Sequence, residues 1–203
     1  MKSPTPGRWA SPCGSRTPKS TLTPDRPLPP RQPGPTACRL TVSRWLRPLP
    51  TPHPPQASLG IGAMEALRSV HDRPDLVLTV VTGNLKLNAL LKLAVFDLGG
   101  YVDTEIGAFA SDDQHRLALV AVAQKRAQAK HGTIFTRSNT VIIGDSLEDV
   151  RTGLEGGAAV VAVASGKTQV TTLREAGADV LLGTLENVQE LHYAIASVVQ
   201  LRL

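Results

Sequence analysis

At 203 residues the sequence is long enough for one ordinary domain, alone or with a tail, and its formal net charge is +5. The charge is uneven: residues 1–58 hold nine Lys or Arg and one acidic residue, Asp25, so the rest of the chain is net acidic. This argues against a nucleic-acid-binding core, because a phosphate-binding face needs its Lys and Arg clustered on folded structure. No run approaches the roughly 18 to 20 apolar residues of a membrane span, so we expect a cytoplasmic protein with no membrane partner.

Residues 1–58 are predicted to form a disordered head rich in proline and arginine. Of the 16 prolines, 15 lie between Pro4 and Pro55, and each lacks an N–H donor and disfavours a helical predecessor. With few large apolar residues, ordering this segment would cost more free energy than burial returns. A PxxP ligand, a basic tether and a leader without function stay open as interpretations. Residues 39–46 are an exception, since they could form a short strand.

Residues 59–203 are predicted to form the folded domain, in which strand and helix patterns alternate. In chain order we expect a helix ending at residue 70, a strand at 76–81, a helix at 85–98, a short strand at 105–108, a helix at 112–130, a strand at 140–143, a helix at 147–155, a strand at 159–163, a helix at 169–176, a strand at 179–182 and a helix at 186–199. The alternation and the short connections predict an α/β fold with a parallel sheet and helices on both faces. No cysteine follows Cys38, so this domain has neither a disulfide nor a thiolate metal site.

Polar side chains follow two of the predicted buried strands. Thr82 comes directly after residues 76–81, and Asp145 comes directly after residues 140–144. Asp149 follows one helical turn after Asp145. Ligands of open parallel sheets bind beyond the carboxyl ends of the strands, and paired carboxylates suit Mg²⁺. The alternative is that Ser146 or Asp145 only caps the next helix.

The motifs around these residues resemble those of the haloacid dehalogenase (HAD)-like hydrolases. Residues 80–84, Val-Val-Thr-Gly-Asn, look like the second HAD motif, and residues 141–150 look like the fourth, a strand ending in Gly-Asp followed by an acid and Val. Residues 162–166 and 173–179 are similar to the following segment of the phosphoglycolate-phosphatase-like branch. Further residues also resemble a bacterial branch of that group: Gly107-Ala-Phe, Asp112, Asp113 and Arg116. The likeness covers about residues 60–200 and implies a Rossmann-like three-layer core.

The resemblance implies phosphoryl transfer from a small phosphorylated metabolite, with Mg²⁺ as cofactor. Thr82 would hydrogen-bond the phosphoryl group, assisted by the amides of Gly83 and Asn84. Asp145 would bind Mg²⁺, and Asp149 would support the metal directly or through water. These residues carry the predicted phosphate and metal sites.

The third HAD motif is a cation that offsets the charge of the phosphoryl oxygens. By the resemblance this catalytic cation is Arg116. Lys125 and Lys92 are weaker candidates, because solvated helix charges account for them equally well.

The first HAD motif, Asp-x-Asp-x-Thr, supplies the aspartate nucleophile in this family, and no Asp-x-Asp occurs in the sequence. We therefore expect an amino-terminally truncated member that lacks this motif, the cap domain and the first, central strand. Without that strand the strands ending at Thr82 and Asp145 either close up on each other, or a piece of the head such as residues 40–42 fills the slot. Neither alternative restores a nucleophile.

Two hypotheses for the function follow. The first is a Mg²⁺-dependent phosphatase of small phosphate esters that is inactive or severely impaired. The second is a non-catalytic module that binds phosphate or a partner. The substrate and the oligomeric state stay open, although a sheet without its middle strand could recruit another chain.

Overall fold

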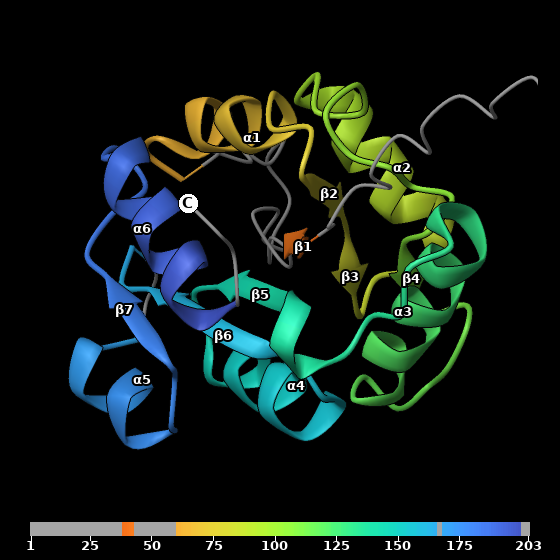
Figure 1. The fold of residues 1–203 in the computed structure, drawn as a ribbon. Coiled ribbons are helices and arrows are strands. Elements are labelled where there is room, and N and C mark those ends of the chain that lie inside the picture. The colour runs from red at the N-terminus through yellow and green to blue at the C-terminus, as the bar shows by residue number, and fades with distance from the viewer. Residues whose placement is uncertain (1–37, 43–59, 166–167, 200–203) are drawn as a thin grey trace, which may run out of the picture. The chain divides into compact units, whose positions relative to one another are not determined.

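The computed structural model describes residues 38–42, 60–165 and 168–199 (Figure 1). Its strands are β1 (Cys38–Val42), β2 (Leu76–Thr79), β3 (Val81–Thr82), β4 (Ala108–Phe109), β5 (Thr140–Gly144), β6 (Ala159–Val163) and β7 (Val180–Leu182). Its helices are α1 (Ala63–His71), α2 (Lys86–Val95), α3 (Ala118–His131), α4 (Leu147–Gly156), α5 (Val170–Glu175) and α6 (Val188–Val198), with a 3₁₀ turn, η1 (Arg137–Asn139). No helix formed by these residues is long and apolar enough to cross a membrane.

The strands form a parallel sheet in the order β2-β1-β5-β6-β7, and β3 and β4 form a separate parallel pair. Strands and helices alternate along the chain from α1 onward. The predicted α/β class with a parallel sheet is therefore confirmed.

The position between β2 and β5 is occupied by β1, which lies within the predicted head. Leu40 stands opposite Leu78 of β2 and Val141 of β5, so β1 pairs on both sides. Of the two alternatives for the missing central strand, the structure shows the second, in which a piece of the head fills the slot. The backbone groups that β2 and β5 would otherwise leave unpaired are satisfied in this way. The remaining head residues, 1–37 and 43–59, lie outside the described part of the chain, so the predicted disorder and the boundary at residue 58 stay predictions.

Helices cover both faces of the sheet, because successive strand residues point to opposite sides. Val141 and Ile143 of β5 share a buried cluster with residues of α1 and α6. Ile142, between them, packs with Val120 of α3. On β6, Val160 and Ala162 pack with Val150 of α4 and Leu173 of α5.

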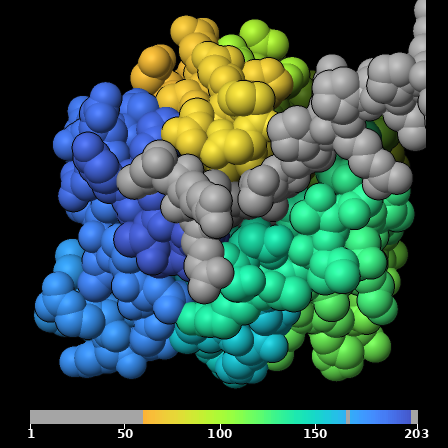
Figure 2. Space-filling view, viewed as in Figure 1, coloured from red at the N-terminus to blue at the C-terminus, as the bar shows by residue number. Residues whose placement is uncertain are grey.

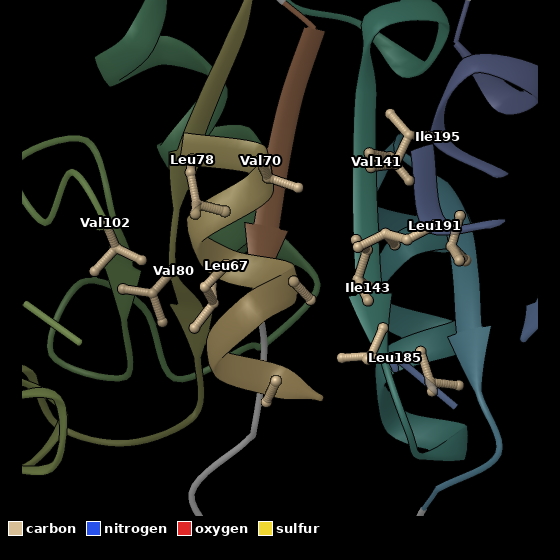
Figure 3. Close-up of a cluster of buried hydrophobic side chains, with 14 of the residues drawn as sticks. Leu67, Val70, Leu78, Val80, Val102, Val141, Ile143, Leu185, Leu191 and Ile195 are labelled. Atoms are coloured by element: carbon tan, nitrogen blue, oxygen red, sulfur yellow. The ribbon is translucent and has the colours of Figure 1, made fainter. Parts of the chain in front are cut away.

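The largest buried cluster lies beneath α1 and α6. Figure 3 shows Leu67 and Val70 of α1 beside Leu78, while Leu191 and Ile195 of α6 lie beside β5. The two helices contact each other and form adjoining surface in the space-filling view (Figure 2). This cluster fixes α1 and α6 over one face of the sheet.

Two predicted strands differ from the structure around Val80. The predicted strand at 76–81 divides there into β2 and β3, because the carbonyl of Val80 accepts from the amide of Ala108 at 2.9 Å. The chain thus leaves the large sheet to pair with β4. This strand, Ala108–Phe109, is two residues long and shares only Ala108 with the strand predicted at 105–108.

The predicted helix at 112–130 begins only at Ala118. Before it, the carboxylate of Asp112 accepts from the amide of Phe109 at 2.9 Å and that of Asp113 from the amide of His115 at 2.7 Å. Such local side-chain bonds compete with helical hydrogen bonding, so the helix starts later than predicted.

Candidate functional site

Thr82 and Asp145 come shortly after two residues, Thr79 and Ile142, that lie on either side of Thr41 in the sheet. Thr79 stands opposite Thr41, and Thr41 stands opposite Ile142. Thr82 and Asp145 each follow this row by three residues, on strands that run in the same direction. Asp145 follows β5 directly at the carboxyl edge of the large sheet, which is where parallel sheets bind ligands, whereas Thr82 ends β3, which follows β2 along the chain and pairs with β4.

The hydroxyl of Thr82 is held by Asn84. Its Oγ1 accepts from the side-chain Nδ2 of Asn84 at 2.9 Å and from the amide of Asn84 at 3.2 Å. A hydroxyl oxygen has two acceptor positions and one donor hydrogen, so both acceptor positions are filled from within the chain. The hydrogen of this buried hydroxyl is left to be donated to another group, which suits an anionic oxygen.

The orientation of Asn84 is in turn fixed by Lys92 of α2. The ammonium of Lys92 donates to Oδ1 of Asn84 at 3.3 Å, which turns the Nδ2 group toward Thr82. The sequence analysis missed this role of the Asn84 side chain. The sequence offers a signal only for the backbone bond, since a Thr hydroxyl often bonds to the amide two residues further on.

Asp149 is fully buried in the first turn of α4. Its Oδ2 accepts from the hydroxyl of Ser146 at 2.7 Å and from the amide of Asp145 at 3.2 Å, and the amide of Asp149 donates to Ser146 Oγ at 3.3 Å. The predicted capping role of Ser146 is thus present. These bonds fix the carboxylate of Asp149 beside the backbone of Asp145.

Gly144 allows the close approach between β5 and Asp149. A Cβ atom at this position would lie 2.4 Å from Cβ and 2.6 Å from Cγ of Asp149. Only glycine fits there without displacing the buried carboxylate. The Gly-Asp pair of the fourth motif therefore has a direct steric reason.

Arg116 forms an ion pair with Asp149 through one guanidinium nitrogen and Oδ1. The side chain of Arg116 is 21% exposed, and its Nε is buried without a hydrogen-bond partner among the described residues. The structure brings the predicted cation to the fourth motif, where the charge of Asp149 balances it. Lys125 is exposed on α3 and takes no part in these contacts.

Asp145 is the carboxylate of this site that fits Mg²⁺ best. It is half-buried at the carboxyl edge, whereas Asp149 is sealed. In the described part of the chain no group of three or more His, Cys, Asp or Glu comes together to hold a metal. Mg²⁺ does not require such a group, since it binds one or two carboxylates and completes its coordination with water and substrate phosphate.

A cavity of about 360 Å³ lies at the other end of β2 from this site. It is lined by His71, Arg73, Pro74, residues 76–78, residues 100–103 and His131. Because it is at the amino end of the strand, it is separate from the carboxyl edge that carries Thr82.

Comparison with known proteins identifies the family. The sequence profile of the haloacid dehalogenase-like hydrolases matches residues 37–153, more than half of the chain. The chain belongs to this family. A second profile, HAD-hydrolase-like, matches residues 118–191 of the HAD protein. The first match begins one residue before β1, so the family likeness extends further toward the amino end than residue 60.

Solved structures share the fold of this HAD protein. A candidate beta-phosphoglucomutase from Bacteroides vulgatus is 21% identical with a TM-score of 0.58, over 72% of this chain and 57% of that one. A predicted phosphatase from Clostridium acetobutylicum is 22% identical with a TM-score of 0.53, over 68% and 60%. A HAD family hydrolase from Deinococcus radiodurans R1, solved with bound phosphate and sodium, is 21% identical with a TM-score of 0.51, over 68% and 58%.

These identities support the fold alone. The HAD protein spans between 57% and 60% of the length of these three structures. No curated protein sequence matches the chain. The phosphoglycolate-phosphatase-like branch stays a prediction, as does the cytoplasmic location.

Proposed function

We propose that this HAD protein binds the phosphoryl group of a small phosphorylated metabolite together with Mg²⁺ at the carboxyl edge of its sheet, and that it turns the ester over slowly or not at all. The two hypotheses from the sequence differ in whether the bound ester is hydrolysed. We favour the second of them, a phosphate-binding module.

The observation that carries the proposal is that the Thr82 hydroxyl is set up to donate a hydrogen bond. Asn84 fills both acceptor positions of Oγ1, so the hydroxyl acts as a donor. The ammonium of Lys92, bonded to the same Asn84, adds positive charge on this side. A donor and a cation next to each other favour an anionic ligand, and we take Lys92 as the cation beside the phosphoryl group.

Asp145 is proposed as the metal ligand and Asp149 as the group that holds it in place. When bound, Mg²⁺ would neutralise phosphoryl charge. Asp149 contributes through the amide of Asp145, to which its Oδ2 is bonded. Arg116 offsets the buried charge of Asp149 through their ion pair.

The expected lack of turnover follows from the sequence after β1. In the family the nucleophilic aspartate follows the first strand, whereas here Val42 is followed by Ser43 and Arg44. No Asp-x-Asp occurs anywhere in the chain. The covalent step of the family therefore has no aspartate to carry it.

Calorimetric titration of the full chain with inorganic phosphate, with and without Mg²⁺, tests the proposal. We expect saturable binding that Mg²⁺ strengthens. Thr82→Ala should weaken it about tenfold or more, since a hydrogen bond to a charged group contributes about 1.5 to 3 kcal/mol. Thr82→Ser, which keeps the hydroxyl, should bind like the parent. Binding that is absent, or that Thr82→Ala leaves unchanged, would contradict the proposed site.

A further inference from the structure

The cavity of about 360 Å³ lies beside β2, the edge strand of the large sheet. Among the described residues no strand pairs with β2 on the side away from β1, since β4 pairs with β3. The segment at residues 100–103 approaches β2 at its carboxyl end. There the amide of Asp103 donates to the carbonyl of Leu78 at 2.8 Å, and the hydroxyl of Thr79 donates to the carbonyl of Asp103 at 2.6 Å. The space between this segment and the start of β2 is the cavity.

The cavity is large enough for a small organic molecule. Pockets that bind such molecules range upward from about 300 Å³, and benzene occupies a cavity of about 150 Å³. The volume of about 360 Å³ therefore suits a molecule of two fused rings. Part of the lining is buried and apolar, formed by Leu76, Leu78 and Val102. This lining favours a ligand with an apolar body.

The aromatic pair at the cavity adds a hydrogen-bond acceptor. The rings of His71 and Tyr101 meet edge to face with their centroids 5.6 Å apart. Nδ1 of His71 lies 3.2 Å from the carbonyl oxygen of Tyr101. Because a carbonyl only accepts, Nδ1 carries the proton of this bond, and Nε2 of the neutral imidazole is then an acceptor. A ligand with a ring N–H can donate to it.

The charged side chains at the cavity are already paired. Arg73 donates from Nε and Nη2 to the carboxylate of Asp75, at 2.7 Å in both bonds. The carboxylate of Asp103 pairs with the ammonium of Lys130 at 3.0 Å. A charged ligand would have to compete with one of these pairs, whereas an uncharged ligand would not. The paired charges therefore select against ions.

We infer that this cavity binds an uncharged heterocycle of two fused rings, which donates a ring N–H to His71 and lies beside Tyr101. Indole has this chemistry and serves as the probe. The site is separate from the proposed phosphate site, because it lies at the amino end of β2 and shares no residue with that site.

Titration of the full chain with indole, followed by the backbone amide signals in ¹⁵N NMR spectra, tests the inference. We expect saturable shifts at residues 76–78 and 100–103, with a dissociation constant of roughly millimolar or lower. 1-Methylindole lacks the N–H and should bind about fivefold more weakly. Shifts that do not saturate, shifts confined to other residues, or equal affinity for the two compounds would overturn the inference.

A pair of tyrosine variants tests the aromatic wall. Tyr101→Ala removes one ring of the cavity and should weaken indole binding about fivefold. Tyr193→Ala is the matched control, because Tyr193 is 66% exposed on α6 and does not line the cavity. Circular dichroism of both variants checks the fold. Two folded variants with the same affinity for indole would contradict the assignment, and the comparison of the two compounds on the parent chain does not depend on either variant.

Indole-3-acetate, an anion built on the same rings, tests the selection against charge. The parent chain should bind it about fivefold or more weakly than indole, because Asp75 already occupies Arg73. Asp75→Asn removes this competitor and should narrow the difference. Asp72→Asn, which removes the same charge from an exposed neighbour, is the control and should not. An anion that the parent binds as tightly as indole, or equal effects of the two variants, would overturn the selection for an uncharged ligand.

Discussion

Asp149 is a buried carboxylate that accepts hydrogen bonds from a hydroxyl, a backbone amide and a guanidinium. Replacing one partner of a buried ion pair leaves the other charge uncompensated, at a cost of about 3 to 5 kcal/mol. Asp149→Asn should therefore lower the free energy of unfolding by about 3 kcal/mol, measured by urea denaturation. Glu148→Gln removes the same charge from an exposed neighbour and should change it little. Equal effects of the two variants would contradict the role assigned to Asp149.

Gly144 offers a second prediction at the level of one residue. A Cβ here would overlap with Asp149, so Gly144→Ala should destabilise the protein by about 1 to 3 kcal/mol, the range for overpacking. A Cβ at Gly99 meets no atom within 4 Å, and Gly99→Ala is the control. Thermal unfolding of both variants measures the difference. A Gly144→Ala protein as stable as its control would show that Asp149 can move without cost.

The sequence was sufficient to predict that Thr82 ends one strand and that Asp145 directly follows another. The sequence could not rank Lys92 above Lys125 as the candidate cation, because the pattern of a helix does not show whether a charged side chain faces water or a site. Only the bond between Lys92 and Asn84 separates them. Whether Ser146 or Asp145 caps the next helix was left open, and the hydrogen bond from the amide of Asp149 to Ser146 Oγ shows that Ser146 caps α4.

At the scale of elements, Asp112 and Arg126 tie the segment after β4 to α3. Two guanidinium nitrogens of Arg126 donate to the Asp112 carboxylate at 2.6 and 2.9 Å. The hydrogen bonds from Arg126, and with them the one from the amide of Phe109, hold the pKa of Asp112 below its usual range. The folded state thus favours the charged carboxylate, and this stabilisation is lost as the pH falls below the ordinary carboxyl pKa of about 3.9.

Asp112→Asn should accordingly cost about 1 kcal/mol at neutral pH, a modest value because the pair borders solvent. The difference from the parent should shrink as the pH falls below about 4, because the unfolded parent chain takes up a proton at Asp112 before the folded state does. Urea denaturation at neutral and acid pH measures this. Asp113→Asn, one residue on and bonded to the amide of His115, is the control for a general charge effect. A difference that grows on acidification would have the wrong sign.

The same segment explains why the element boundaries were only partly predictable. One helix was predicted over residues 112–130, yet Asp112 and Asp113 bond to nearby amides and α3 begins at Ala118. Strands and helices buried on a continuous apolar face, such as β6 (Ala159–Val163), occur where the pattern indicated.

For the whole molecule, the decisive element is β1, which lies inside the sheet and pairs with both β2 and β5. A proline in this strand removes a ladder hydrogen bond and clashes with its neighbours, at about 3 kcal/mol or more. Leu40→Pro should therefore prevent folding or lower the melting temperature strongly. Gln32→Pro, outside the strand, is the control. If Leu40→Pro melted like the parent, the sheet would not depend on β1.

The sequence could not decide that β1 joins the sheet. Its five residues lie between proline-rich stretches, and local pattern gave no information on a partner far along the chain. The apolar strands at 76–81 and 140–144 required a neighbour, but they did not specify which segment would supply it. Long-range pairing of this kind appears only in the folded structure.

The central claim is a phosphate site without an attacking aspartate, and hydrolysis of p-nitrophenyl phosphate in the presence of Mg²⁺ tests it most directly. The full chain should release p-nitrophenol at the rate of buffer alone, and Asp145→Asn should do the same. Mg²⁺-dependent hydrolysis above that rate, abolished by Asp145→Asn, would contradict the account.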